Sequence, residues 1–519
     1  MTTRPLRLIT FLSEVGRPQL HHQPWTRYEL QREGWERLCE KLSEHTDWVL
    51  LALWAEGYDQ SRNPPVPWVH VALFDEKVGV LAVASLKCPD YEFPSLAKAW
   101  PGAIPLEWAI HDLRKPTRTG LTDLRPWLVH PADPPPDPPY ELPTAEVKQD
   151  AARRNEDCTL HYIPVGPVHA GIIEPGYFRF TCHGETVVRL EIRLGYVHKG
   201  IEGLLSGKLI GDAAKIVGRV SGDSTVAYAL AFARAVEEAT GTEVPKRAHY
   251  LRALMAEMER VANHLGDIGA ICNDASFVPI HARCGRSRED LLRAAEDAFG
   301  HRLMMDCIVS GGVKVNLTDA AANNIVSLVT TIKERLEQLV DGYHKNVSLK
   351  DRTVGIGKLS ADLAHRYGAG GFIGRASSRC FDARRQLKYP PYDSLTVKVP
   401  VVSEGDVDAR LRIRIEEVKV SLDLIVDIIT SMPQGVVFAA LNPTGNTETE
   451  GLAVVEGFRG DVLVWVRLAA DGKTVLRCHH RDPSWFQWTL LGAAIDKSIV
   501  ADFPLCNKSF NCSYAGHDL

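Results

Sequence analysis

The chain has 519 residues, of which 45% are hydrophobic and 24% are charged, and its formal net charge is −5. This composition is close to the globular average and excludes a disordered or collagen-like chain. The length suggests roughly two to four domains. The weakly acidic balance argues against a general nucleic-acid binder, which needs a basic face to neutralise phosphates.

Eleven cysteines are too few for a disulfide scaffold, and no two of them are spaced C-x-x-C. The N-terminal segment has no secretory apolar core. The longest apolar stretches, such as 78–84, are far shorter than the ~20 residues of a membrane-spanning helix. We therefore expect a cytoplasmic protein with reduced thiols and no membrane span of its own.

The first part of the chain mixes helix and strand signals. Residues 27–42 carry apolar side chains at helical spacing, whereas 48–54 and 68–74 are apolar runs suited to strands. We expect a small α/β domain over residues 1–130. Half of the residues in 130–143 are proline, which fixes φ and removes a hydrogen-bond donor. The segment 131–150 is therefore predicted to be an extended, proline-rich linker.

The second part, 151–519, begins with strand signals and continues with helices. Alternating apolar and polar residues over 178–194, with a turn at 183–185, predict an antiparallel hairpin. Apolar residues with a period near 3.6 then predict four long helices. They are expected at 216–240, from Pro245 to about Gly266, at 319–341 with Gly342 as a C-cap, and at 406–431. A short strand pair is expected to return near 452–468. The predicted fold class is α+β, with a mainly helical bundle domain edged by an antiparallel sheet.

Two short motifs suggest other chemistry. Residues 368–374 read GAGGFIG, close to a dinucleotide-binding loop, but the preceding residues do not form a strand pattern, so a glycine loop is the alternative. Cys478, His479 and His480 are metal-ligating residue types, but adjacent residues of a strand point to opposite faces and rarely share one ion.

Several ordered segments resemble the large catalytic subunits of group 4 [NiFe]-hydrogenases (hydrogenase-4 and formate hydrogenlyase) and the homologous 49-kDa-type subunit of complex I. In the second part these are 166–169, 174–176, 193–202, 310–313, 374–377, 381–384, 481–484 and 502–504. Residues 93–96, 107–113 and 123–128 loosely resemble the 30-kDa-type subunit, which is fused to the large subunit in such hydrogenases and in the C/D fusion form of NADH-quinone oxidoreductase.

The sequence departs from the family at the metal ligands. A Ni–Fe centre needs four thiolates from two C-x-x-C pairs, because soft sulfur ligands hold nickel and iron. The first pair belongs at Ser221 and Ser224, and near the C-terminus Cys512 is the one cysteine that can remain from the second pair. The complex I quinone donors, a His and a Tyr, fall near Ile173 and Gly222, so neither is present. We therefore expect no metal and no cofactor bound by this chain.

The resemblance implies two proton-relay candidates. Glu174 matches the carboxylate that hydrogenases use for proton transfer, and Glu202 matches an acid near their metal. A buried carboxylate has a raised pKa, which favours a relay, whereas the alternative is that both acids pair with basic neighbours. The cavity-lining candidates are His169, Ser221, Ser224, Asp382, Arg384 and Cys512, with Asp382 and Arg384 expected to form a structural ion pair.

Three functions follow from the resemblance. The leading hypothesis is a large subunit, without its own Ni–Fe centre, of a membrane-associated complex that couples electron transfer to ion translocation. The alternatives are reduction of a quinone or another acceptor in the vacated cavity, and a non-catalytic assembly scaffold. The implied partners are an iron–sulfur small subunit holding a [4Fe-4S] cluster, a ferredoxin-like subunit and antiporter-like membrane subunits. The chain is then peripheral, on the cytoplasmic side of the inner or plasma membrane, and binds no nucleic acid.

Overall fold

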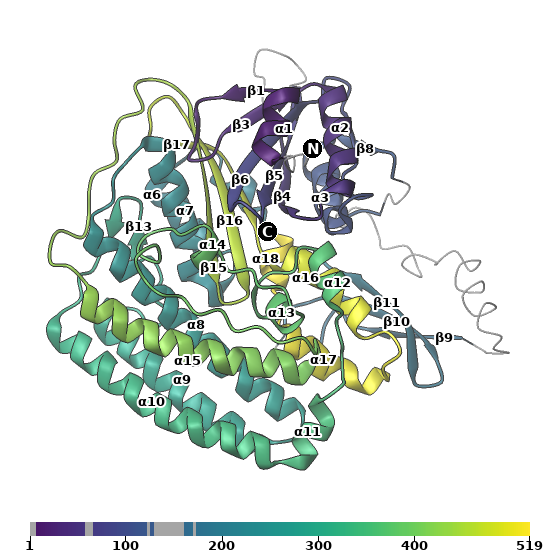
Figure 1. The fold of residues 1–519 in the computed structure, drawn as a ribbon, viewed down its shortest axis with the longest axis vertical. Helices are drawn as coiled ribbons and strands as arrows, with labels where there is room; N and C mark the ends of the chain where they lie inside the picture. Colours follow the sequence, from purple (N-terminus) through teal and green to yellow (C-terminus); the bar gives the residue numbers. More distant parts are fainter. Residues whose placement is uncertain (1–6, 58–65, 122–124, 129–159, 170–172) are drawn as a thin grey trace, which may run out of the picture.

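The structure, a computed structural model, describes residues 7–57, 66–121, 125–128, 160–169 and 173–519 (Figure 1). The predicted linker at 131–150 lies outside these residues. The observed mixture of helices with open sheets confirms the α+β class. None of the helices in the described part has the length and hydropathy needed to cross a membrane.

The N-terminal part is built on a five-stranded sheet in the order β1-β3-β6-β5-β4. Its strands and helices are β1 (Gly16–Gln19), β3 (Arg27–Leu30), β4 (Trp48–Gly57), β5 (Pro67–Asp75), β6 (Val80–Lys87), α1 (Leu8–Val15), α2 (Arg32–Glu44) and α3 (Ile104–Arg114). The predicted strands are confirmed in β4 and β5. The helix predicted at 27–42 is wrong for its first residues, because alternate residues of β3 are buried and β3 pairs with β1 and β6.

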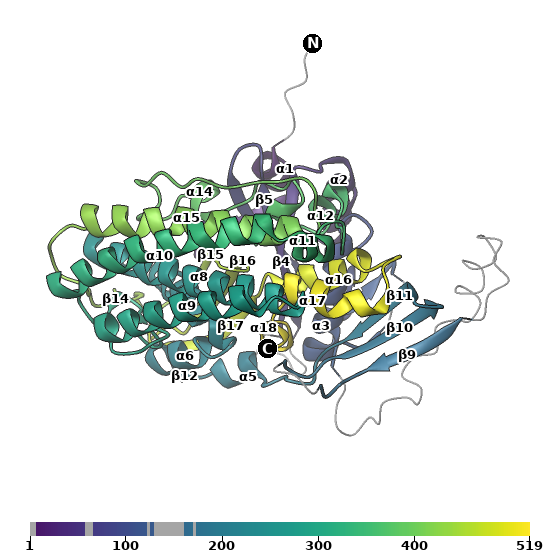
Figure 2. The same cartoon turned by 90° about the horizontal axis from the view of Figure 1, so that it is seen from below.

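Two further sheets belong mainly to the second part. The predicted hairpin is confirmed as β10 (Tyr177–His183) and β11 (Thr186–Arg193), with β9 (His161–Val165) beside β10. Figure 2 shows this sheet projecting to one side of the helices. The other sheet has the order β12-β17-β16-β15-β2 and contains β12 (Lys208–Leu209), β15 (Thr449–Gly457), β16 (Gly460–Leu468) and β17 (Thr474–Arg481). The returning strand pair is thereby confirmed.

The two parts share this second sheet. Strand β2 (His22–Gln23) of the N-terminal part pairs in parallel with β15. Trp54 of β4 also stacks on His479 of β17, with ring centroids 5.3 Å apart. The first part of the chain is therefore joined to the second by backbone pairing and by buried side chains.

Four long helices form the lower half of Figure 1: α8 (Lys246–Asp274), α9 (Val278–Phe299), α10 (Asp319–Lys345) and α15 (Val407–Ser431). A fifth, α7 (Thr225–Thr240), lies above them. The helix predicted at 406–431 is confirmed, and Asp406 caps it by accepting the Ala409 N–H. The helix predicted at 216–240 is wrong for its first turns. Residues 218–224 are not α-helical, and α7 begins only at Thr225. Helices α8 and α10 run past Gly266 and Gly342, because each glycine keeps helical backbone geometry inside a packed helix.

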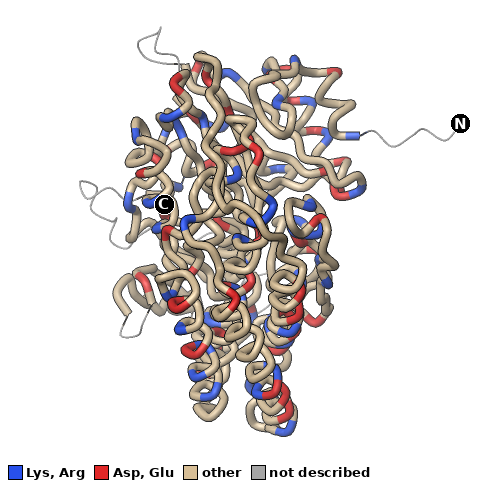
Figure 3. Tube along the Cα trace, turned by 90° about the vertical axis from the view of Figure 1, so that its left-hand side faces the viewer, with Lys and Arg blue, Asp and Glu red and all other residues tan. Residues whose placement is uncertain are grey.

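Short elements complete the fold: β7 (Glu92–Pro94), β8 (Thr117–Thr119), β13 (Ile308–Val309), β14 (Gly312–Val313), η1 (Pro101–Ala103), η2 (Gly222–Ser224), η3 (Val500–Asp502), α5 (Ile201–Leu205), α6 (Ile210–Val217), α11 (Val347–Thr353), α12 (Ala361–Arg366), α13 (Gly371–Ala376), α14 (Ala383–Gln386), α16 (Ser484–Ala494), α17 (Phe503–Phe510) and α18 (Tyr514–Asp518). On the side shown in Figure 3, Lys and Arg are interspersed with Asp and Glu along the chain.

Candidate functional site

The two predicted ligand motifs meet where η2 and the C-terminal segment come together. Ser221 precedes the single turn of η2 and Ser224 is its last residue, between α6 and α7. The Ser221 Oγ lies 3.0 Å from the Oγ of Ser513, the residue that caps the short C-terminal helix α18. Cys512, the predicted remnant of the second pair, is buried, and burial raises the pKa of its thiol. In the C-terminal segment it is therefore Ser513, and not the predicted Cys512, whose hydroxyl contacts Ser221.

This contact places the fourth ligand position at Gly516, three residues after Ser513, as Ser224 is three residues after Ser221. The Asp482 carboxylate occupies the space where a side chain would stand, since a Cβ on Gly516 would lie 2.5 Å from the Asp482 Oδ2. That carboxylate accepts hydrogen bonds from the Tyr228 hydroxyl at 2.6 Å and from the Ser484 N–H at 2.8 Å. Burial, followed by the charge of Asp482, raises the pKa of Tyr228 well above its ordinary value.

A guanidinium–carboxylate pair lies beside the serines. The Arg459 guanidinium donates to Asp223 at 2.7 and 2.5 Å and to the Ser224 Oγ at 3.2 Å. The Ser221 hydroxyl also donates to Asp223, at 2.9 Å. Burial alone would raise the pKa of Asp223, but the charge and hydrogen bonds of Arg459 and the serine hydroxyls lower it below its ordinary value. Asp223 is therefore ionised at neutral pH.

The glycine loop at 368–374 contributes to the placement of Arg459, which stands in the turn between β15 and β16. Gly371 has φ +61° and lies so close to the Arg459 carbonyl that a Cβ would collide with it. The Arg459 side chain reaches the C-terminal segment, where its Nε donates to the Asn511 carbonyl at 2.6 Å. The loop leads into α13 without a strand before it, so its glycines serve close packing.

These residues do not fit a Ni–Fe centre. Three of the four ligand positions carry serine hydroxyls. At the fourth, Gly516, the Asp482 carboxylate fills the space that a thiolate side chain would need. A permanently charged guanidinium within hydrogen-bond distance of Ser224 opposes any added cation. Elsewhere in the described ranges no group of three or more His, Cys, Asp or Glu side chains is arranged to hold a metal.

Glu202 connects the two parts of the chain. Its carboxylate accepts from His479 at 2.7 Å and from Arg114 of α3 at 3.1 Å. Burial alone would raise the pKa of Glu202, but the hydrogen bond and charge of His479, together with Arg114, lower it to about 2. The expected raised pKa is therefore wrong for Glu202. Its role as a proton relay stays a prediction.

Glu174 and His169 lie near the C-terminal helix. Glu174 is exposed and accepts the Ala515 N–H at 3.1 Å, next to the serine site, so the expectation of a buried carboxylate is also wrong there. The His169 ring lies 2.8 Å from the Gly176 carbonyl. The Cys478 Sγ lies 3.5 Å from the His480 Nε2 on one face of β17, whereas His479 points to Glu202 on the other, as the strand alternation predicted.

Asp382 and Arg384 form the expected ion pair inside the protein, with Nη2 and Oδ2 2.7 Å apart. Arg384 also donates to Glu257 of α8 at 2.9 Å. The same network continues through the Arg375 guanidinium, which bridges Asp382, Glu417 of α15 and Glu456 of β15. All of these side chains are almost fully buried, so the network joins helices to the central sheet.

Sequence reasoning missed Asp223, Arg459, Asp482, Ser513 and Glu259 as site residues. The sequence held a signal for Ser513. Residues 513–516 (SYAG) have a small residue at each end with two residues between them, as do residues 221–224 (SGDS). Glu259 of α8 accepts the N–H groups of Val226 and Ala227 at 2.7 and 3.1 Å. It lines a cavity of about 20 Å³ with Asp223, which has room for about one water.

Glu259 is expected to make stability depend on pH, because burial raises its pKa from 4.5 to about 8. Between these values the folded chain holds a proton that the unfolded chain has lost, so wild-type stability falls as pH rises from about 5 to 8. Glu259→Gln removes this contribution, and its urea midpoint should change less over that range. Glu337→Gln, an exposed position on α10, should keep the wild-type slope. Equal slopes in wild type and Glu259→Gln would contradict the assignment.

Comparisons with known proteins agree with the resemblance. Residues 199–266 match the family described as nickel-dependent hydrogenase, and residues 274–447 match the respiratory-chain NADH dehydrogenase 49 Kd subunit. The carbon monoxide-induced hydrogenase of Rhodospirillum rubrum is 31% identical over 68% of this chain and 98% of its own length. Formate hydrogenlyase subunit 5 of Escherichia coli (strain K12) is 28% identical over 82% of this chain and 77% of its own length.

Two further relatives extend the comparison. The C/D polypeptide of NADH-quinone oxidoreductase from Bacteroides fragilis is 28% identical over 75% of this chain and 78% of its own length. A chain in the structure of the membrane-bound sulfane sulfur reductase, described as an archaeal respiratory membrane complex, superposes with a TM-score of 0.65 at 25% identity and covers 70% of this chain and 99% of its own length. The chain therefore belongs to the family of group 4 hydrogenase large subunits and their complex I counterparts.

Proposed function

We propose that this chain is the large subunit of a membrane-associated oxidoreductase complex of the hydrogenase-4 or complex I type, and that it works without a Ni–Fe centre of its own. The observation that carries the proposal is the serine site. The scaffold brings Ser221, Ser224, Ser513 and Gly516 together, but three of these positions carry hydroxyls in place of thiolates, and the Asp482 carboxylate fills the side-chain space at the fourth. The Arg459 guanidinium and the Asp223 carboxylate bond to the serine hydroxyls.

In this proposal the chain couples electron transfer in its partners to ion translocation in membrane subunits. Electrons pass through a [4Fe-4S] cluster of an iron–sulfur small subunit, supplied through a ferredoxin-like subunit, and antiporter-like subunits move the ion. The complex then lies on the cytoplasmic side of the membrane.

The surface around the serine site supports the docking of partners. Large apolar side chains are exposed on α5 and on the loops next to β9 and β11; they are Val168, Ile173, Tyr196 and Leu204. Exposed apolar groups gathered in one region mark protein–protein contact surfaces. We assign this surface to the small subunit.

The quinone alternative receives less support from the site geometry. The cavity beside Asp223 holds about one water, which is less than a quinone ring needs. We therefore place no acceptor at the serine site.

Metal analysis of the purified complex tests the proposal. We expect nickel well below one atom per complex, with no hydrogen evolution from reduced electron carriers. Stoichiometric nickel together with hydrogen evolution would overturn it.

A second measurement separates a proton role from scaffolding. Glu174→Gln removes the ionisable group next to Ala515, and Glu185→Gln in the exposed β10–β11 turn is the matched control. Loss of electron-transfer activity in an assembled Glu174→Gln complex, with a normal Glu185→Gln complex, supports a proton role. Normal activity in both supports the scaffold.

A further inference from the structure

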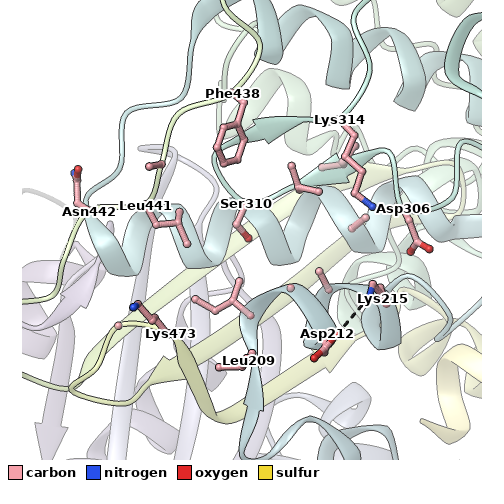
Figure 4. Close-up of a pocket in the computed structure, with 18 of the residues that line it drawn as sticks. Leu209, Asp212, Lys215, Asp306, Ser310, Lys314, Phe438, Leu441, Asn442 and Lys473 are labelled. Atoms are coloured by element: carbon pink, nitrogen blue, oxygen red, sulfur yellow. Dashed lines mark hydrogen bonds and ion pairs between the residues drawn. The ribbon is translucent and has the colours of Figure 1, made fainter.

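A cavity of about 900 Å³ opens beside α6 (Figure 4). It lies between α6, the β13–β14 hairpin and the segments 438–443 and 471–473. Apolar side chains make most of its wall, among them Ile210, Ile308, Phe438 and Leu441. Pockets of this size with mostly apolar walls are typical of small-molecule sites.

The carboxylates around the cavity are already engaged. Asp306 accepts two hydrogen bonds from the Arg219 guanidinium, both 2.8 Å long. Asp212 pairs with Lys215 at 3.3 Å. Asp471 accepts the backbone N–H groups of Lys473 and Thr474 within its own turn. The negative charges at the rim are therefore held by groups of the chain itself.

Three donors remain available to an occupant. Within the described part of the chain no carboxylate lies at ion-pair distance from Lys314 or Lys473, and both side chains are exposed. The Ser310 Oγ is buried and has no hydrogen-bond partner there. Figure 4 shows Ser310 in the middle of the cavity, with Lys314 and Lys473 toward opposite ends. A buried hydroxyl without a partner costs free energy, which a hydrogen bond to a ligand would recover.

We propose that this cavity binds an amphipathic anion, that is, an apolar chain carrying a carboxylate or phosphate group. The apolar walls take up the chain, Ser310 donates to or accepts from its polar end, and one of the two lysines neutralises the anion. Because Asp306 holds Arg219, the ligand would lie next to the segment that carries Ser221 and Ser224. The proposal is independent of whether the serine site takes part in electron transfer.

Decanoate binding to the full chain tests the proposal, with calorimetry as the measurement. Gly211→Phe blocks the cavity without disturbing the fold, because Gly211 lines it and a Cβ there meets nothing within 4 Å. Gly285→Phe on α9 is the matched control, since its Cβ also meets nothing within 4 Å. We expect wild type and Gly285→Phe to bind alike, and Gly211→Phe to bind at least tenfold more weakly with unchanged thermal stability. No binding by wild type, or equal affinity in Gly211→Phe, would overturn the proposal.

A separate experiment tests whether the cavity requires an anionic ligand. Lys314→Ala combined with Lys473→Ala should weaken decanoate about tenfold and leave the neutral amphiphile octyl glucoside unchanged, while Lys345→Ala at the far end of α10 should alter neither. Equal loss for both amphiphiles would contradict an anion site.

Vesicles distinguish the two sources of such a ligand. Flotation with phosphatidic acid vesicles that Gly211→Phe abolishes identifies a bilayer lipid, whereas decanoate binding without flotation identifies a free amphiphile; both support the site. Decanoate binding to the isolated chain but not to the assembled complex would show that another protein of the complex covers the cavity, and would overturn the proposal.

Discussion

Arg384→Met is expected to destabilise the chain by about 3–5 kcal/mol, because it removes from two buried carboxylates a counter-ion that they share. Arg384 is 1% exposed and pairs with Asp382 and Glu257, which are equally buried. A methionine keeps an unbranched apolar side chain at this position but supplies no charge. The measurement is the urea concentration at which half of the helical circular-dichroism signal is lost.

The matched control is Arg293→Met, whose side chain is 73% exposed and pairs with Glu289. It should change stability by less than about 1 kcal/mol. Combining Arg384→Met with Asp382→Asn and Glu257→Gln should recover part of the loss, since the uncompensated charges are then gone. A midpoint for Arg384→Met equal to that of Arg293→Met would contradict the assigned network.

Arg459→Met is expected to cost about 2–3 kcal/mol and to loosen the serine site. Its guanidinium donates to Asp223, to Ser224 and to the Asn511 carbonyl, so it connects η2 to the C-terminal segment. Arg459→Lys keeps the charge but not the planar fork and should give an intermediate result. Amide hydrogen exchange over residues 511–518 reports the loosening directly.

Two further variants serve as controls for the Arg459→Met result. Adding Asp223→Asn to Arg459→Met should restore part of the stability, because it removes the unpaired carboxylate. Arg302→Met, an exposed arginine paired with Glu289, should leave exchange over 511–518 unchanged. Unchanged exchange in Arg459→Met as well would show that Arg459 does not hold the C-terminal segment.

Local patterns were reliable where burial repeats at a fixed period. The alternation in β10 and β11 and the helical period of α15 were read correctly, since one buried face imposes one pattern on the sequence. The same reasoning failed at β3, whose four residues are too few to separate a strand from the start of a helix. It also failed at Gly266 and Gly342, where packing outweighs the low helix propensity of glycine.

The sequence by itself determined the family and the loss of the thiolates, because both are matters of residue identity at ordered motifs. Only the tertiary structure decided what replaced the metal ligands. Ser221 and Ser513 are 292 residues apart, and nothing local to either indicates that their hydroxyls meet. Likewise, Arg459 and Asp482 enter the site because a glycine loop and a sheet bring them there. Long-range packing, which no local period encodes, sets these contacts.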